Sequence, residues 1–294
     1  MYQKRKKRIQ PFDVFVYAVA AALLVIVAYP LILVISCSFS SPELVATGKI
    51  TLLPREITFD GYREILKNKD ILIGFVNSVF YMVLGTMFDL FVTVPAGYVL
   101  TKRQLPGHKF FTFFFMFTMY FSGGIIPSFL LVNNIGLYNS RLTLIILGGF
   151  SMYNCIICRS FFDSIPKEME ESAAIDGCSV IGTFVRIILP LSKALIGVMV
   201  LFFAVQHWNS YFDAMIYIKD DALQTLQVIL RRILVLAQQL ATAEEAGEYA
   251  QQMANYEALM RYAVIVVSSL PLMVAYPFVQ KYFDKGVMIG SVKG

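Results

Sequence analysis

Few residues in this chain have the types and spacing that bond chemistry requires. Cys155 and Cys158 form a Cys-x-x-Cys pair, which matches half of a zinc site or a dithiol redox site. A single pair lacks the other ligands of a zinc cage, and this pair lies inside a long apolar stretch. We therefore expect two small side chains packed among helices, with no disulfide and no metal.

Asp89 stands alone in another apolar stretch, where an isolated carboxylate can serve as a proton relay. That chemistry is typical of an ion- or proton-coupled secondary carrier, which is the alternative function to weigh. One carboxylate gives this alternative little support, and an Asp that is bonded to its own helix or faces a partner chain is the other reading. The chain has no clustered acid, base, nucleophile and metal ligands, so we expect no enzymatic activity.

The elements that position these residues are membrane spans. The chain is 57% hydrophobic and 15% charged, with a mean hydropathy of +0.66, which is far from the balance of a soluble domain. The first uncharged run, Val14 to Ile35, exceeds the apolar region of a signal peptide, so we expect a retained helix. The expected fold is all-α and polytopic, with six transmembrane helices at about Phe12–Ser36, Gly74–Leu100, Phe110–Val132, Leu142–Phe162, Ala194–Ile218 and Leu259–Phe278.

Charge asymmetry gives these spans an orientation. The tail, residues 1–11, carries five basic residues and no acid, whereas the connection 219–257 has three basic residues against six acidic ones. An even number of spans puts both ends of residues 12–294, which we take as a single transmembrane domain, on one side of the membrane. Both termini are therefore expected to be cytoplasmic, and the loop 219–257 external.

The two larger external connections have their own expected structure. We expect Ser40–Asp70 to fold as a small excursion. In the loop 219–257 an apolar pattern from Leu223 to Leu234 indicates an amphipathic helix on the membrane or on a partner. Residues 238–252 could be helical or a flexible loop. The packing residues expected in Ser40–Asp70 are Ile50, Leu52, Ile57 and Tyr62.

The polar connection 164–192 falls on the cytoplasmic side. Ser164 can cap a helix that runs to about Asp176, with Pro166 in its first turn. Gly177 suits a left-handed turn at the end of that helix. Pro190 is expected to mark the bend into the fifth span. A second helix should follow the glycine, with an apolar stripe made of Val180, Phe184, Ile187, Ile188 and Leu191.

A motif in this connection, Glu171-x-Ala173-x-x-x-Gly177 followed by nine residues and Ile-x-Leu-Pro, resembles the signature loop of permease subunits of binding-protein-dependent ABC importers. Ser172 replaces the usual first alanine, which is a change between small residues. The resemblance continues into the maltose-type, oligosaccharide branch of carbohydrate permeases. The further segments that carry it are Ala96–Arg103, Phe121–Pro127, Asn134–Leu137 and the tail Lys285–Gly294.

The resemblance implies a type I ABC importer permease fold with cytoplasmic coupling helices, in a bacterial plasma membrane. It assigns docking on an ATPase to the loop, through Glu171, Ala173, Asp176 and Gly177. ATP and Mg would be bound by that partner, since this chain has no G-x-x-x-x-G-K-[ST] loop. The implied partners are a second homologous permease, two ATPase subunits, an external substrate-binding protein and membrane lipid, with no nucleic acid. The implied cargo is an oligosaccharide, with an acidic uronic-acid oligomer as one option.

Polar and aromatic groups within the spans are candidates for the substrate pathway, because isolated polarity usually faces the protein interior or a wet cavity. Trp208 could stack on a sugar ring while Gln206 and Asn209 bind its hydroxyls. Such groups also commonly tie helices together, so packing is the competing role. The candidates are Asn77, Tyr81, Asn154, Gln206, Trp208 and Asn209, with His207 and Asp213 beside them.

Overall fold

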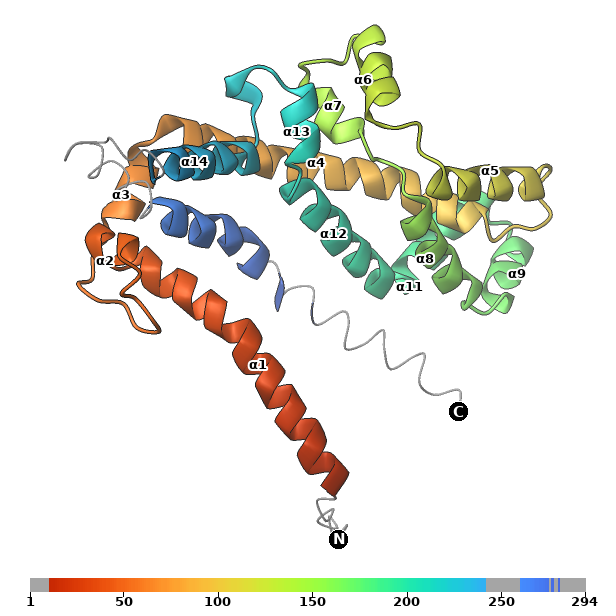
Figure 1. Ribbon diagram of the computed structural model, residues 1–294. Helices are drawn as coiled ribbons and strands as arrows, with labels where there is room; N and C mark the ends of the chain where they lie inside the picture. Colours follow the sequence, from red (N-terminus) through yellow and green to blue (C-terminus); the bar gives the residue numbers. More distant parts are fainter. Residues whose placement is uncertain (1–10, 242–259, 275, 278–279, 281–294) are drawn as a thin grey trace. The chain divides into compact units, whose positions relative to one another are not determined.

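The structure, a computed structural model, describes residues 11–241, 260–274, 276–277 and 280 (Figure 1). Every regular element in these ranges is helical, so the all-α expectation is confirmed. The helices are α1 (Pro11–Ser38), α2 (Pro42–Ala46), α3 (Asp60–Lys67), α4 (Lys69–Val99), α5 (His108–Tyr120), α6 (Ile125–Asn134), α7 (Arg141–Ile146), α8 (Met152–Asp163), α9 (Glu168–Ile175), α10 (Val180–Thr183), the π-helical η1 (Phe184–Ile188), α11 (Leu189–Leu191), α12 (Lys193–Trp208), α13 (Phe212–Tyr217), the 3-10 turn η2 (Asp221–Leu223), α14 (Leu226–Ala241) and Met260–Val274.

The chain divides into two compact units, which we describe separately. One comprises residues 1–68 and 232–268, and the other comprises residues 69–231 and 269–294. The basic tail 1–10, most of the segment 238–252 and the terminal segment 285–294 lie outside the described residues.

The spans differ in how continuous they are. Among the described residues, α1 and α4 are each long and apolar enough to cross a membrane alone. The third expected span is instead a bent pair, α5 and α6, which meet at 115°. Gly124 with φ 89° begins the second half, a conformation that glycine adopts at little steric cost. The fourth and fifth spans are also interrupted, as α7–α8 and α12–α13, so the expectation of continuous helices there is wrong.

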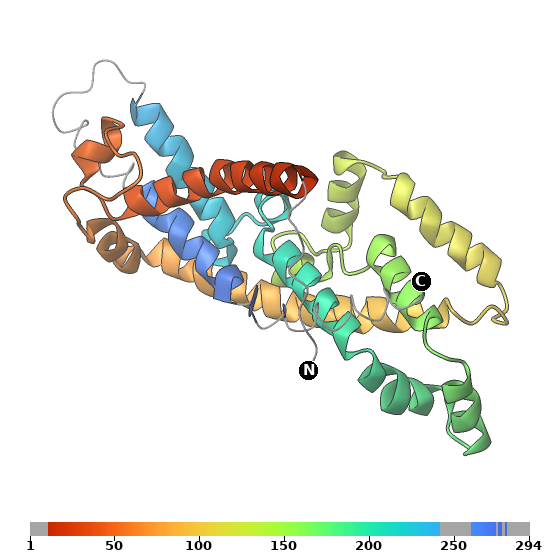
Figure 2. The same ribbon diagram turned by 90° about the horizontal axis from the view of Figure 1, so that it is seen from below.

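In the second unit, α4 is the helix against which α7, α8 and α12 pack (Figures 1 and 2). Gly97 of α4 lies against α8, because a Cβ placed on Gly97 would fall 2.5 Å from the Cβ of Cys158. Cys155 and Cys158 are both fully buried, as packing among helices requires. One apolar core of this unit consists of Val94, Tyr98, Cys158, Phe162, Ile188, Leu195, Met199 and Phe203.

The expected amphipathic helix after the fifth span is α14. Its first turns are buried within this chain, with Leu226 at 0% and Ile229 at 7% exposure. A Cβ placed on Gly74 of α4 would lie 2.4 Å from Ile229. This part of α14 therefore packs on the chain's own α4, and the expectation that it lies on the membrane or on a partner is wrong.

In the first unit, the excursion Ser40–Asp70 is folded, as expected, around α2 and α3. Ile50 is buried in an apolar cluster. Tyr62 stacks on Phe39 at 5.0 Å between ring centroids, and its hydroxyl lies 2.8 Å from that of Ser38. Tyr62 is partly buried by these contacts, and the loss of solvent around its hydroxyl raises its pKa. Leu52 and Ile57 are instead 48% and 67% exposed, so their assignment to the packing residues is wrong.

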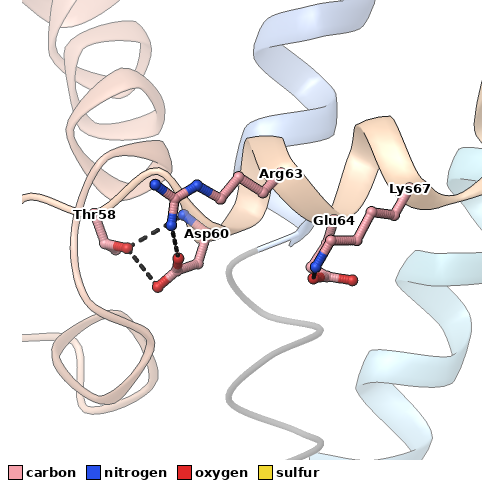
Figure 3. Close-up of polar contacts among 5 residues, drawn as sticks. All are labelled: Thr58, Asp60, Arg63, Glu64 and Lys67. Carbon is pink, nitrogen blue, oxygen red and sulfur yellow. Dashed lines mark hydrogen bonds and ion pairs between the residues drawn. The ribbon is translucent and has the colours of Figure 1, made fainter.

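The outer face of α3 is charged, as Figure 3 shows. Asp60 accepts a hydrogen bond from the Thr58 hydroxyl at 2.6 Å and pairs with Arg63 at 3.4 Å. One turn later, Lys67 pairs with Glu64 at 2.7 Å. Acid in the first turn and base in the last turn complement the helix dipole, while exposed ion pairs of this kind contribute about 0–1 kcal/mol each.

Candidate functional site

The first helix of the connection 164–192 is α9, and its end is fixed by backbone hydrogen bonds. Gly177 has φ 76°, and its N–H donates to the carbonyl of Ala174 at 3.1 Å. The N–H of Cys178 donates to the carbonyl of Ala173 at 2.9 Å. These two bonds define a Schellman motif, in which the left-handed residue is usually glycine. The left-handed turn expected at Gly177 is therefore confirmed.

The start of α9 differs from the expectation. Ser164 does not cap α9, because it ends α8, where its hydroxyl donates to the carbonyl of Phe161 at 2.6 Å. Lys167 occupies the cap position of α9 and makes no side-chain capping bond. The N-terminal end is instead stabilised by three acids in the first turn, because their negative charges are attracted to the positive end of the helix dipole. These acids are Glu168, Glu170 and Glu171.

The second helix of the connection is the continuous run α10, η1 and α11. Ser179 begins it by accepting a hydrogen bond from the N–H of Gly182 at 3.1 Å. The run meets α12 at 83°. This bend comes at Ser192 and not at Pro190, which lies inside the run just after the π-helical turn, so the expectation that Pro190 marks the bend is wrong.

Only part of the expected apolar stripe faces the protein interior. Phe184 stacks on Tyr98 at 4.8 Å between ring centroids, and Ile188 is 1% exposed. Val180 and Leu191 are 70% and 50% exposed, so the expected stripe does not form one continuous buried face. The π-helical turn in η1 breaks the 3.6-residue period on which that assignment depends.

The turn between the two helices carries exposed apolar side chains. Ile175 is 86% exposed, Val180 70% and Ile181 76%. Glu171 and Asp176 are also exposed, whereas Ala173 is buried at 3%. We call Glu171, Ile175, Asp176, Val180 and Ile181 the loop tip. The loop tip therefore combines three exposed apolar side chains with two exposed carboxylates.

Side chains from α4 and the following loop hold α9 in place. Lys102 forms an ion pair with Glu170, and its ammonium lies 4.4 Å from the centroid of the Tyr98 ring. A pocket of about 560 Å³ lies beside this ion pair. It is lined by residues 101–104, by the end of α8 with the residues after it, and by Glu170 and Glu171 of α9. The end of α4, residues 101–104 and the end of α8 therefore form the surface on which α9 lies, which we call its seat.

Four of the six pathway candidates are buried, and two of them, Asn77 and Tyr81, form hydrogen bonds within the chain. Asn77 donates hydrogen bonds to the carbonyls of Ala222 at 2.8 Å and Gln224 at 3.1 Å. Tyr81, which is fully buried, donates its hydroxyl to the carbonyl of Leu223 at 2.9 Å. These bonds tie the segment after α13 to α4, which is the packing role that polar groups have in helix bundles.

Trp208 is also buried, at 1% exposure, and its ring meets Phe75 edge to face at 5.8 Å between centroids. Asn154, at the start of α8, is 6% exposed. Gln206 and Asn209 are exposed, and they lie three residues apart near the end of α12, on one face of the helix. Of the six candidates, these two present polar side chains at the surface of this chain.

The structure also pairs residues that the sequence left separate. Asp89 is neither bonded to its own helix nor turned outward, because its Oδ2 accepts a hydrogen bond from Nε2 of His207 on α12 at 2.9 Å. Arg141, which was not among the candidates, lies 3.4 Å from Oδ1 of Asn77 and 5.1 Å from the Phe80 ring centroid. Its only signal in the sequence is a single arginine directly before an apolar run. Within the described part of the chain, no group of three or more His, Cys, Asp or Glu residues is placed to hold a metal.

Comparison with known proteins gives a family match across most of the chain. Residues 71–289 match the family described as binding-protein-dependent transport system inner membrane component. The Bacillus subtilis (strain 168) polygalacturonan/rhamnogalacturonan transport system permease protein YtcP is 39% identical over 96% of this chain and 98% of its own length. Protein LplC of the same organism is 40% identical over 90% of this chain and 89% of its own length.

A solved structure agrees with this match. It is described as that of a bacterial ABC transporter involved in the import of the acidic polysaccharide alginate. One of its chains superposes with a TM-score of 0.83 at 31% identity, over 96% of this chain and 99% of that chain.

Proposed function

Because this chain belongs to the family of binding-protein-dependent transport system inner membrane components, we propose that it is the permease subunit of an ATP-driven importer for an acidic oligosaccharide. The names of two similar proteins support the cargo class: one concerns polygalacturonan and rhamnogalacturonan, and the other alginate. All three polysaccharides contain uronic acids. Their shared carboxylate chemistry favours a uronic-acid oligomer.

The loop tip is the observation that carries the driving mechanism. Three large apolar side chains on a cytoplasmic loop are exposed in this chain, which marks a surface for protein contact. The chain has no phosphate-binding G-x-x-x-x-G-K-[ST] loop, so a partner must hydrolyse ATP. We assign the loop tip to a groove on a cytoplasmic ATPase subunit.

The residues of the loop have different tasks in this proposal. Exposed Glu171 pairs with a basic group of the ATPase, and Asp176 adds a second carboxylate beside it. Gly177 fixes the angle between α9 and α10. Ala173 acts from the inside, since its small buried side chain lets α9 lie close to its seat.

The transport cycle follows from two such loops on two permeases. ATP-driven closure of two ATPase subunits would move both loops and rock the permeases between inward and outward access. The cargo would arrive on an external binding protein. Gln206 and Asn209, exposed on one face of α12, would offer hydrogen bonds to saccharide hydroxyls, whereas Asn77, Tyr81 and Trp208 maintain helix packing.

Purification of the chain from its native membrane tests this proposal. We expect it to bring down a second permease and two ATPase copies, with ATPase activity that rises when a binding protein loaded with oligogalacturonate is added. Ile181→Asp should lose the ATPase but keep the second permease, whereas Ile181→Leu should keep both. Proton-driven uptake by the purified chain alone would instead establish the secondary carrier.

A further inference from the structure

We infer that the hydrogen bond between Asp89 and His207 is a positioning contact that makes α4 and α12 move as one lever during transport. The inference rests on the proposed function, because it concerns how movement of the loop tip reaches the external half of the permease. Neither residue lies in the connection 164–192 or belongs to the loop tip that we assign to the ATPase. Both belong to the same compact unit.

The two ends of α12 are joined to α4 in different ways. At the cytoplasmic end, Leu195 and Met199 pack with Val94 and Tyr98 in the apolar core. This core also includes Ile188 of η1, so the loop connection moves with this end. At the other end, the ring of Trp208 meets Phe75 of α4. His207 adds a directional contact there by donating to Asp89 at 2.9 Å. A helix of the 16 residues of α12 is about 24 Å long, so one end alone would leave the other free to tilt.

The burial of the pair makes this contact specific. Asp89 is 0% exposed and His207 is 4% exposed. In such a site water cannot replace a lost partner, so separation of the two helices leaves an unpaired polar group in an apolar surrounding. An apolar contact would tolerate sliding, but a directional bond between two buried groups holds one register. The pair therefore resists tilting of α12 relative to α4. Such tilting would prevent movement of the loop from reaching the far end of α12.

Gly85 provides the space for the imidazole. A Cβ placed on Gly85 would lie 2.3 Å from Cε1 and 2.4 Å from Nε2 of the His207 ring. Contacts this short cannot persist, so alanine at this position must displace the ring or the helix. Gly85→Ala therefore disturbs the same contact without removing either bonding group.

The position of His207 links this contact to the pathway candidates. Gln206 precedes it, and Asn209 follows two residues later, both exposed. Fixing His207 against α4 fixes the direction in which these two amides point. The contact thus connects the driven end of α12 with the end that would meet the cargo.

The test measures uptake per ATP hydrolysed in proteoliposomes that contain the whole complex. Asp89→Leu and Gly85→Ala should each lower this ratio by roughly five-fold or more, the lower range of usual coupling effects, while ATPase activity continues. Asp89→Asn keeps an oxygen that can accept the bond and should retain the ratio. Thr93→Val is the matched control, since Thr93 is equally buried, lies one turn from Asp89, and has no hydrogen-bond partner for its hydroxyl within the described structure.

The outcomes separate this inference from the proposed function. If Asp89→Leu or Gly85→Ala assembles and keeps the wild-type ratio, the positioning role is refuted while ATP-driven import stands. If Thr93→Val lowers the ratio as much as Asp89→Leu does, general disruption of the helix interface explains the effect and the inference is overturned. If the wild-type complex shows no ATP-driven uptake, the proposed function itself fails.

Discussion

At the scale of single residues, the loop depends on one backbone conformation and one charge. Gly177 has no neighbour within 4 Å of an added Cβ, so only its φ of 76° resists substitution. Glu171 is exposed and lines the pocket beside Lys102. Both residues were identified from the motif, because a glycine after a helix and an acid in its first turn have local physical reasons. Their functional roles remain predictions.

We predict that Gly177→Ala strains the turn by about 1 kcal/mol or more, because a Cβ disfavours the left-handed conformation. The protein should still insert, while uptake and stimulated ATPase activity fall by roughly five-fold, the factor to which 1 kcal/mol corresponds. Asparagine tolerates this conformation better than other residues, so Gly177→Asn should keep more activity than Gly177→Ala. Equal activity in the wild type and Gly177→Ala, measured on assembled complexes, would contradict the role of the turn.

Glu171→Lys should weaken binding of the ATPase more than Glu171→Gln, because it reverses the charge as well as removing the acceptor. We expect a loss of roughly tenfold for the lysine variant, measured as the ATPase concentration that half-saturates the permease. Glu168→Lys is the matched control, since Glu168 lies in the same first turn and outside the wall of the pocket. An equal effect of both lysine variants would mean that only the net charge of α9 matters.

At the scale of elements, the sequence predicts helix positions better than helix continuity. The apolar runs predict α1 and α4 because apolar length alone identifies a span. The breaks within α5–α6 and α7–α8 were missed, because hydropathy does not distinguish a straight helix from two short ones. The glycines of Ser122-Gly123-Gly124 were a readable signal for the first break. Pairing of Asp89 with His207 could not be predicted. The two residues are 118 positions apart in the sequence, and their contact depends on the register between α4 and α12.

The seat of α9 gives a prediction at the same scale. Lys102→Glu places a carboxylate beside Glu170 and should loosen α9, while the double change Lys102→Glu with Glu170→Lys should restore it. Each side chain is about one third exposed, at 33% and 30%, so the pair contributes only about 0–1 kcal/mol to folding. The effect should therefore appear in stimulated ATPase activity and not in the melting temperature. Arg103→Glu, in the same pocket wall, is the control for added negative charge.

At the scale of the whole molecule, we expect the loop tip to receive movement and α12 to transmit it along α4. The family assignment rests on residues throughout the chain, from 71 to 289, and not on the loop alone. Identification of the cargo depends on similar proteins, because the two exposed pathway candidates, Gln206 and Asn209, carry amides, which bind many hydroxylated ligands. Charge on the cargo is therefore the property most worth testing.

ATP-driven import is best tested by uptake into proteoliposomes that contain this permease, its partner permease and two ATPase subunits. With a binding protein outside and ATP inside, we expect labelled oligogalacturonate to accumulate against its gradient, and a neutral oligosaccharide of equal length to accumulate less. Uptake should stop without ATP or without the binding protein. Accumulation that needs neither, but follows an imposed proton gradient, would contradict the account.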